Sequence, residues 1–315
     1  MEPRIQYAKT KDGVSIAFST LAEGMPIVRM PHPFTHLQLD WEIPESRSWD
    51  ERLAKNRQLV CYDARGTGLS DRDMTDFSLY ARVRDLEAVV DRLGLERVAL
   101  FAPLLSGPVA IAYAVRHPER VSHLIFWSSG ARTTDLTGGP QAQALLQLAN
   151  ADWEMFTETL AHVGLGWSAG EEARRYAAVL RESITQEGLQ ALMSAPDIDV
   201  TELLPQVRSP TLVLHRRQAP FPSVDTARGL ASRIPNARLV LLEGESANAH
   251  LGDTEAVHGA IDEFLDEGEE AAAAPRLAAE DIHTILFTDI EGSTAMTQRL
   301  GDVKARDLLR EHERL

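Results

Sequence analysis

Cysteine is nearly absent from this chain of 315 residues, in which Cys61 is the one thiol. A single thiol cannot form an internal disulfide and has no second cysteine for a CxxC metal site. Long hydrophobic runs are also missing, since no window reaches 18 apolar residues, which argues against a transmembrane helix. Residues 1–11 mix charges and lack the apolar core of a secretory signal. We therefore expect a cytoplasmic protein.

Basic residues are scarce relative to acidic ones. The chain has 32 Lys and Arg against 47 Asp and Glu, which gives a formal charge of −15. Binding to nucleic acid by phosphate neutralisation, or to an anionic membrane surface, needs an excess of cations. The charge therefore argues against nucleic acid and membrane as partners. The length corresponds to about two domains and can bury a full core without disulfides or metals.

Apolar runs alternate with amphipathic stretches along most of the chain. Strands are predicted at residues 14–19, 26–30, 58–62, 97–101, 121–127, 210–215 and 237–242, and helices at 78–93, 108–116, 224–233 and 254–265. Residues 131–205 show only helical patterns and are interpreted as an inserted cap. This alternation predicts an α/β fold, with a mostly parallel sheet that helices cover on both faces.

The composition changes after residue 265. Residues 266–281 are acidic and rich in alanine, which is typical of a linker. A further strand, turn and helix are predicted within residues 282–315, a segment too short to fold as an independent domain. We therefore divide the chain into a domain of residues 1–265, a linker of residues 266–281 and an incomplete C-terminal segment.

Several motifs resemble the α/β-hydrolase family. They are YDARGTGLSD at 62–71, GPVA at 107–110 with HPERV at 117–121, and SPTLVLH at 209–215. The family's chemistry needs a serine on a sharp strand-to-helix turn, followed along the chain by an acid and a histidine. The resemblance places Leu104, Ala219 and Ala247 at these three positions. No intact catalytic triad is therefore expected.

Loss of the three groups predicts that acyl transfer is lost and that a dry pocket for a small apolar ligand remains. The loop that supplies the oxyanion hole in the family contains Pro33, which has no N–H to donate. The aromatic residues of the cap could line the pocket or only pack the cap onto the core. Candidate pocket residues are His32, Phe34, His36, Leu104, Leu105, Trp153, Phe156, Trp167, Phe221 and His250.

A displaced triad is the alternative. It would use Ser106, Asp225 and His250, each a few residues from the expected position. Ser106 would lie in the first turn of a helix, where a serine often caps backbone N–H groups. If these residues converge, the domain would be an active esterase-type serine hydrolase.

The C-terminal segment carries a second resemblance. HTILFTDIEGST at 283–294, followed by RLGD at 299–302, is similar to the start of a class III adenylate or guanylate cyclase catalytic domain. The resemblance implies that Asp289 and the carbonyl of Ile290 bind Mg²⁺ or Mn²⁺, although Asp289 could also be a simple helix cap. The other cyclase residues, including those that choose adenine or guanine, would lie beyond Leu315.

Together these observations predict a non-catalytic, ligand-sensing domain, without a cofactor of its own, that regulates a class III adenylate cyclase. The full-length protein would convert ATP to cAMP and would dimerise through the cyclase domain. The two alternatives are the displaced-triad esterase and a scaffold that only promotes dimerisation. The sequence leaves open the ligand's identity and the direction of its effect.

Overall fold

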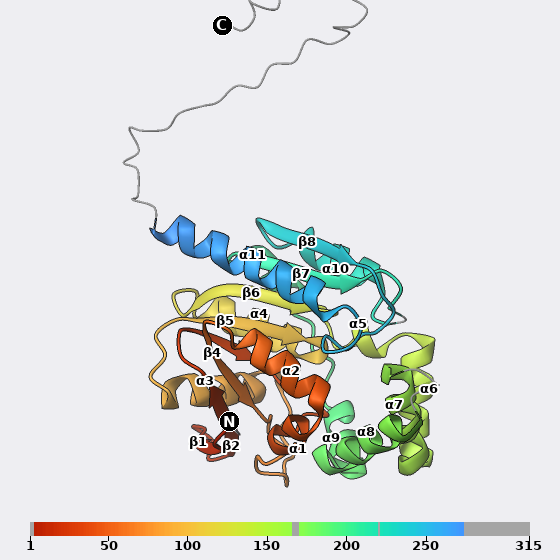
Figure 1. Cartoon of the computed structure of the whole chain (residues 1–315). Coiled ribbons are helices and arrows are strands. Elements are labelled where there is room, and N and C mark those ends of the chain that lie inside the picture. The colour runs from red at the N-terminus through yellow and green to blue at the C-terminus, as the bar shows by residue number, and fades with distance from the viewer. Residues whose placement is uncertain (1–2, 166–169, 220, 274–315) are drawn as a thin grey trace, which may run out of the picture. The chain divides into compact units, whose positions relative to one another are not determined.

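The computed structural model describes residues 3–165, 170–219 and 221–273. Within them, one sheet has the strand order β1-β2-β4-β3-β5-β6-β7-β8 (Figure 1). Strand β2 runs antiparallel to β1 and β4, and the other neighbouring pairs are parallel. The strands span Gln6–Lys9 (β1), Ser15–Leu21 (β2), Met25–Arg29 (β3), Arg57–Tyr62 (β4), Val98–Pro103 (β5), Val121–Trp127 (β6), Thr211–Arg216 (β7) and Ala237–Leu242 (β8).

The central strands are buried on both faces, because helices cover both sides of the sheet. Every residue of β5, β6 and β7 is buried, as expected of parallel strands inside an α/β fold. Neighbouring residues Ile27 and Val28 of β3 point into different hydrophobic clusters on opposite faces. The predicted fold class is therefore confirmed, and β1 is a strand that the sequence pattern did not reveal.

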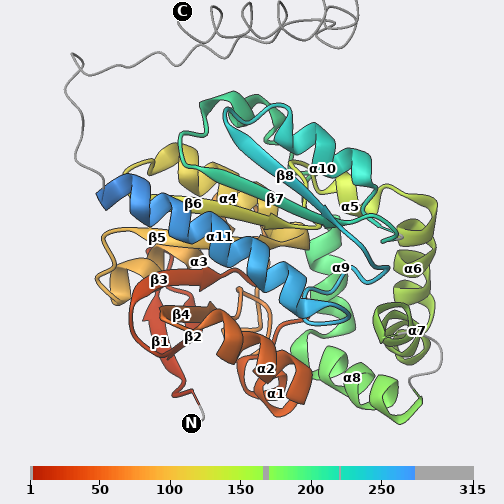
Figure 2. The ribbon, with the colours of Figure 1, turned by 45° about the horizontal axis from the view of Figure 1, so that its top comes forward.

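The helices divide between the two faces (Figure 2). Apolar residues of α3, α4 and α10 join one cluster, and those of α2 and α11 join the other. Ser78 caps α3, and Gly94 follows the helix in the left-handed conformation with φ +64°, as the sequence predicted. These helices are α1 (Leu37–Glu42), α2 (Pro44–Leu53), α3 (Leu79–Arg92), α4 (Gly107–Arg116), α10 (Val224–Ala231) and α11 (Thr254–Ala273).

The inserted cap is helical and has its own small clusters of apolar side chains. Phe34, from the loop after β3, packs against both of these clusters and so connects the cap to the main body. An antiparallel bridge between Arg132 and Asp199 joins the two ends of the insertion. The cap contains α5 (Thr134–Thr137), α6 (Pro140–Ala151), α7 (Trp153–Leu165), α8 (Gly170–Ser183) and α9 (Gln186–Ser194), and a 3₁₀ helix, Thr201–Gln206, follows it.

Helix α11 is longer than predicted. The expected helix ended at residue 265 with a linker after it, but α11 continues to Ala273. Glutamate and alanine are strong helix formers, so this acidic stretch extends the helix rather than ending it. A compact unit of the chain ends at Ala271. The rest of the predicted linker and the cyclase-like residues 282–315 lie outside the described residues.

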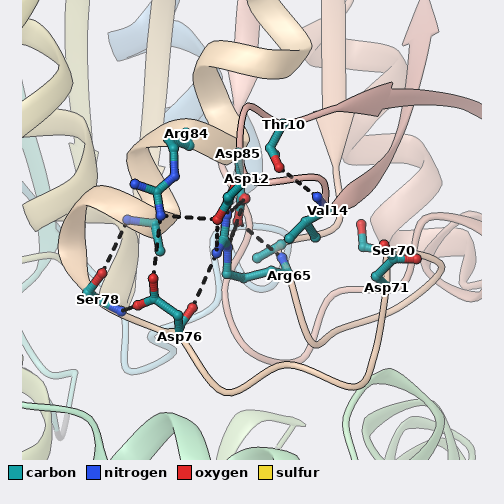
Figure 3. Close-up of polar contacts among 12 residues, drawn as sticks. Thr10, Asp12, Val14, Arg65, Ser70, Asp71, Asp76, Ser78, Arg84 and Asp85 are labelled. Atoms are coloured by element: carbon teal, nitrogen blue, oxygen red, sulfur yellow. Dashed lines mark hydrogen bonds and ion pairs between the residues drawn. The ribbon is translucent and has the colours of Figure 1, made fainter.

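The loop after β4 is held by a buried network of charges (Figure 3). Arg65 makes bidentate bonds to Asp85 of α3, with Nε 2.9 Å from Oδ1 and Nη2 2.8 Å from the same oxygen. Its Nη1 also lies 3.0 Å from Asp12, which in turn pairs with Arg84. The network joins the β1–β2 turn, this loop and α3, and so fixes the loop that resembles the hydrolase motif.

Asp63, in the same loop, anchors the start of α1. Its carboxylate accepts hydrogen bonds from the backbone N–H groups of Leu37 and Leu69. Gly68 has φ +51°, and a Cβ there would collide with the Asp63 carboxylate. Glycine is therefore required for the loop to close around this buried acid. None of the helices in the described part of the chain is both long and apolar enough to cross a bilayer.

Candidate functional site

The turn between β5 and α4 has the sharp shape that a nucleophile elbow needs. Leu104 follows the last residue of β5 with φ +49°, a left-handed conformation that strains a residue with a branched side chain. A Cβ on Gly107 would collide with Ser129 and Gly130, so glycine allows α4 to approach β6 closely. The strained turn predicted from the motif is therefore present, but its side chain is a hydrocarbon.

The structure does not bring the displaced triad together. Ser106 is buried, and its Oγ donates to the carbonyl of Pro103 at 2.6 Å rather than to a helix N–H. Asp225 is exposed on α10, where it pairs with Arg228 at 2.9 Å. His250 lies in a cavity that neither of the other two residues lines.

The other two triad positions also lack functional groups. Ala219 follows β7 and is half-buried. Ala247 lies beside Leu104 in the walls of two adjoining cavities, and its carbonyl accepts a hydrogen bond from the Trp127 indole at 2.7 Å. A methyl group therefore stands at each position where the resemblance expects an acid or a histidine.

An apolar cavity of about 160 Å³, the outer pocket, lies between the cap and the elbow. Six candidate residues line it: His32, Phe34, Leu104, Leu105, Phe156 and Phe221. The cap adds residues that the sequence did not single out, among them Leu145, Leu160, Tyr176, Leu180 and Met193. The cavity can hold a small ligand with a hydrocarbon part.

Three candidate residues are placed elsewhere. His36 caps α1, because its Nδ1 accepts the N–H of Leu39 at 3.3 Å. Trp153 packs against Phe156, with ring centroids 5.3 Å apart, and is not among the lining residues. Trp167 lies outside the described residues.

A smaller and more polar cavity of about 40 Å³, the inner chamber, adjoins the outer pocket. Both are lined by His32, Leu104, Tyr176, Ala247 and Asn248, so the elbow lies where they meet. The charged residues of the inner chamber, Arg29, Asp40 and Asp50, come from β3, α1 and α2. The sequence-based prediction included His250 of this chamber but none of its charged residues.

Arg29 is held at the inner chamber by two neighbours. Its Nη2 donates to Oδ2 of Asp50 at 3.2 Å, and its Nε lies 3.1 Å from Oδ1 of the same carboxylate. The Nε also donates to the sulfur of Cys61 at 3.2 Å. Burial raises the pKa of the Cys61 thiol to about 12, so this sulfur is an uncharged thiol at neutral pH.

Burial leaves both histidines of the chamber uncharged at neutral pH. Burial and the charge of Arg29 lower the pKa of His32 to about 3 and that of His250 to about 4. Nδ1 of His32 accepts the N–H of Phe34 at 3.3 Å, so its ring proton is on Nε2. His32 can therefore donate a hydrogen bond, and neutral His250 can accept a proton.

Burial raises the pKa of Asp40 to about 7, and this gives a testable pH dependence. The folded state binds a proton more tightly than the unfolded chain, whose aspartate has a pKa near 3.8, so ionisation of Asp40 destabilises the fold as pH rises from 4 to 7. We expect Asp40→Asn to gain stability over the native chain between pH 5 and pH 8. Urea unfolding at both pH values measures this difference.

His32 and His250 act in the opposite direction, because their lowered pKa values destabilise the fold at acidic pH. The comparison must therefore be between variants rather than within the native chain. Asp225→Asn, which changes an exposed aspartate on α10, is the matched control and should follow the native curve. Equal pH dependence in all three proteins would show that Asp40 does not carry this linkage.

Comparisons with known proteins were made against this geometry. A family model described as alpha/beta hydrolase fold matches residues 40–254. A candidate carbamate hydrolase, RutD, of Pseudomonas savastanoi pv. phaseolicola is 31% identical over 226 residues, which cover 64% of this chain and 83% of that protein. The AB hydrolase superfamily protein YisY of Bacillus subtilis is 25% identical and covers 82% of this chain and 98% of that protein.

Solved structures agree at the level of the fold. The esterase RhEst1 from Rhodococcus sp. ECU1013 has a TM-score of 0.72 at 18% identity, covering 84% of this chain and 99% of that one. A meta-cleavage product hydrolase from Pseudomonas fluorescens IP01 has a TM-score of 0.70 at 20% identity, covering 83% and 97%.

These relatives contradict the predicted non-catalytic role in cyclase regulation and cAMP signalling. They are hydrolases, and they favour the alternative of an active hydrolase. The comparisons also give no support for a fused cyclase domain. The prediction treated the loss of three side chains as the loss of all chemistry, and it did not foresee the polar chamber beside the elbow.

Proposed function

We propose that this chain, which belongs to the alpha/beta hydrolase fold family, hydrolyses small acyl compounds with an apolar acyl group. Water rather than a side chain would be the nucleophile, because Leu104 occupies the elbow and Ser106 is buried. The observation that carries the proposal is the junction at Leu104 between an apolar pocket and a polar chamber with a neutral histidine. The hydrolases among its relatives support the same class of activity.

The two cavities suit the two ends of an acyl compound. The outer pocket would bind the hydrocarbon chain, because its wall is almost wholly apolar. The inner chamber would hold water and the leaving group, since 40 Å³ has room for about three water-sized groups. The scissile carbonyl would then lie over Leu104, which lines both cavities.

Donors for the developing oxyanion would come from two places. The backbone N–H of Leu105, which follows the elbow residue, stands where the fold usually supplies one donor. The loop after β3 offers no N–H at Pro33, and the N–H of Phe34 is engaged by His32. The Nε2 proton of His32 would replace the missing backbone donor.

His250 would act as the general base. It takes a proton from water while the water oxygen bonds to the carbonyl carbon. The carbon–heteroatom bond then breaks, and the leaving group receives that proton from the imidazolium. Acyl compound and water thus become acid and protonated leaving group, with no covalent intermediate on the enzyme.

Turnover and labelling test this proposal together. The purified chain should release acid from methyl esters or primary amides of four- to eight-carbon acids, as quantified by liquid chromatography and mass spectrometry. Ser106→Ala should retain this activity within about threefold, because the Ser106 hydroxyl only bonds the Pro103 carbonyl. A fluorophosphonate reagent should add no mass to the chain.

The result that would overturn this route is a fluorophosphonate adduct on Ser106 together with loss of activity in Ser106→Ala. Parallel loss in Asp225→Asn would then establish the displaced triad. Absence of turnover on both substrate series would count against hydrolysis of this acyl class altogether.

A further inference from the structure

The inner chamber has more hydrogen-bond acceptors than donors. Asp40 and Asp50 bring two carboxyl groups against the single guanidinium of Arg29. Two nitrogens of Arg29, Nε and Nη2, are already engaged with Asp50 and Cys61. His250 is a neutral imidazole that adds another acceptor.

Asp50 supplies the sharpest sign that a group is missing. The residue is 8% exposed, yet its Oδ1 has no hydrogen bond, although it lies 3.1 Å from Nε of Arg29. A buried carboxylate oxygen without a hydrogen bond costs free energy, so a donor placed in the chamber would be favoured. Because Asp50 lines the chamber, a ligand there can reach it.

The chamber walls favour a compact cation over an anion. Two carboxyl groups would repel an anion, and Arg29 is already paired. Trp49, Phe101 and Trp127 add aromatic rings, which attract cations over their faces. Within the described part of the chain, no three His, Cys, Asp or Glu side chains are grouped as ligands of a metal ion would be. An organic ammonium group therefore fits better than a divalent metal.

We propose that the inner chamber binds a small primary ammonium group, the leaving group of an acyl amide whose hydrocarbon part occupies the outer pocket. This inference rests on the proposed function and narrows its substrate class from acyl compounds to amides of ammonia or small amines. In the reaction, water adds to the carbonyl carbon and the C–N bond breaks. The nitrogen takes the proton held by His250, and the acid's proton then converts the amine to ammonium.

Ligand binding tests the site without any turnover. Methylammonium chloride should raise the unfolding temperature of the full chain saturably, beyond the effect of sodium chloride at equal ionic strength. Tetramethylammonium, which is too large for 40 Å³, and sodium acetate should not. Asp50→Asn and Asp40→Asn should each weaken methylammonium binding about tenfold or more, as loss of a charged hydrogen bond does.

Matched variants keep this test decisive. Asp225→Asn removes an exposed acid from α10 and should bind methylammonium as the native chain does. Asp40→Asn is the second variant because Asp50→Asn leaves Arg29 without its partner and could fail to fold. Preferential binding of acetate, or equal binding by Asp40→Asn and Asp225→Asn, would overturn the inference.

Turnover then separates the two proposals. Hydrolysis of methyl esters without binding or inhibition by methylammonium would leave the proposed function standing and show the ammonium site to be wrong. Methylammonium binding that depends on Asp40 and Asp50, with no hydrolysis of ester or amide, would support the site and reject the function. Competitive inhibition of amide hydrolysis by methylammonium is the result expected if both hold.

Discussion

Arg65→Met is expected to destabilise the fold by about 3–5 kcal/mol at pH 7. The substitution leaves Asp85 without its bidentate partner, although the Asp85 side chain is 1% exposed. An uncompensated buried carboxylate must remain charged at a high cost or take up a proton. Urea unfolding followed by circular dichroism measures the loss, which should shrink at acidic pH because Asp85 then becomes protonated.

Two comparisons isolate the buried pair. In the double variant Arg65→Met, Asp85→Leu, both charges are replaced by apolar groups, so part of the stability should return. Arg228→Met breaks the exposed pair with Asp225 and should cost below about 1 kcal/mol. A loss in Arg65→Met as small as that in Arg228→Met would show that the network in Figure 3 does not hold the loop.

Much of the fold could be predicted because its signals are local. Alternation of short apolar runs with helical periodicity located the central strands, and the capping pair Ser78 and Gly94 located the ends of α3. The antiparallel strand β1 was missed because Gln6–Lys9 has one buried residue among four, a pattern too weak to separate from a loop.

The elbow shows where local signals succeed and where they stop. The motif placed Leu104 at the turn, and the backbone there is strained as a nucleophile elbow would be. Side-chain directions around the turn were not predictable, because they depend on packing across the sheet. His32 and His36 lie four residues apart in one loop, yet one lines both cavities and the other caps α1.

The inner chamber could not be read from the sequence, because β3, α1 and α2 meet there only after folding. One signal was available: Arg29 ends an otherwise apolar strand, and a charge in that position usually has a buried partner. That partner, Asp50, lies 21 residues away with no motif to connect the two. Inference from missing catalytic groups therefore overlooked polar groups that the fold assembles beside them.

His250→Ala should reduce kcat for the proposed acyl hydrolysis by about 10²–10⁴, the usual contribution of a general base. The apolar wall of the outer pocket would be unchanged, so KM should change little. The active form is the neutral imidazole, and burial lowers the pKa of His250 to about 4. Native kcat/KM should therefore rise with pH through about 4 and stay flat above pH 5, until another group titrates.

Chemical rescue distinguishes a base from a residue that only shapes the chamber. Free imidazole added to His250→Ala can enter the space left by the ring and should restore part of kcat, whereas His250→Gln leaves less space and should respond less. Asp225→Asn is the control that keeps native rates, because its carboxylate faces solvent on α10. If His250→Ala keeps kcat within about threefold of the native value, another group moves the proton. The neutral imidazole would then matter only as an acceptor in the inner chamber, and the ammonium site could stand without it.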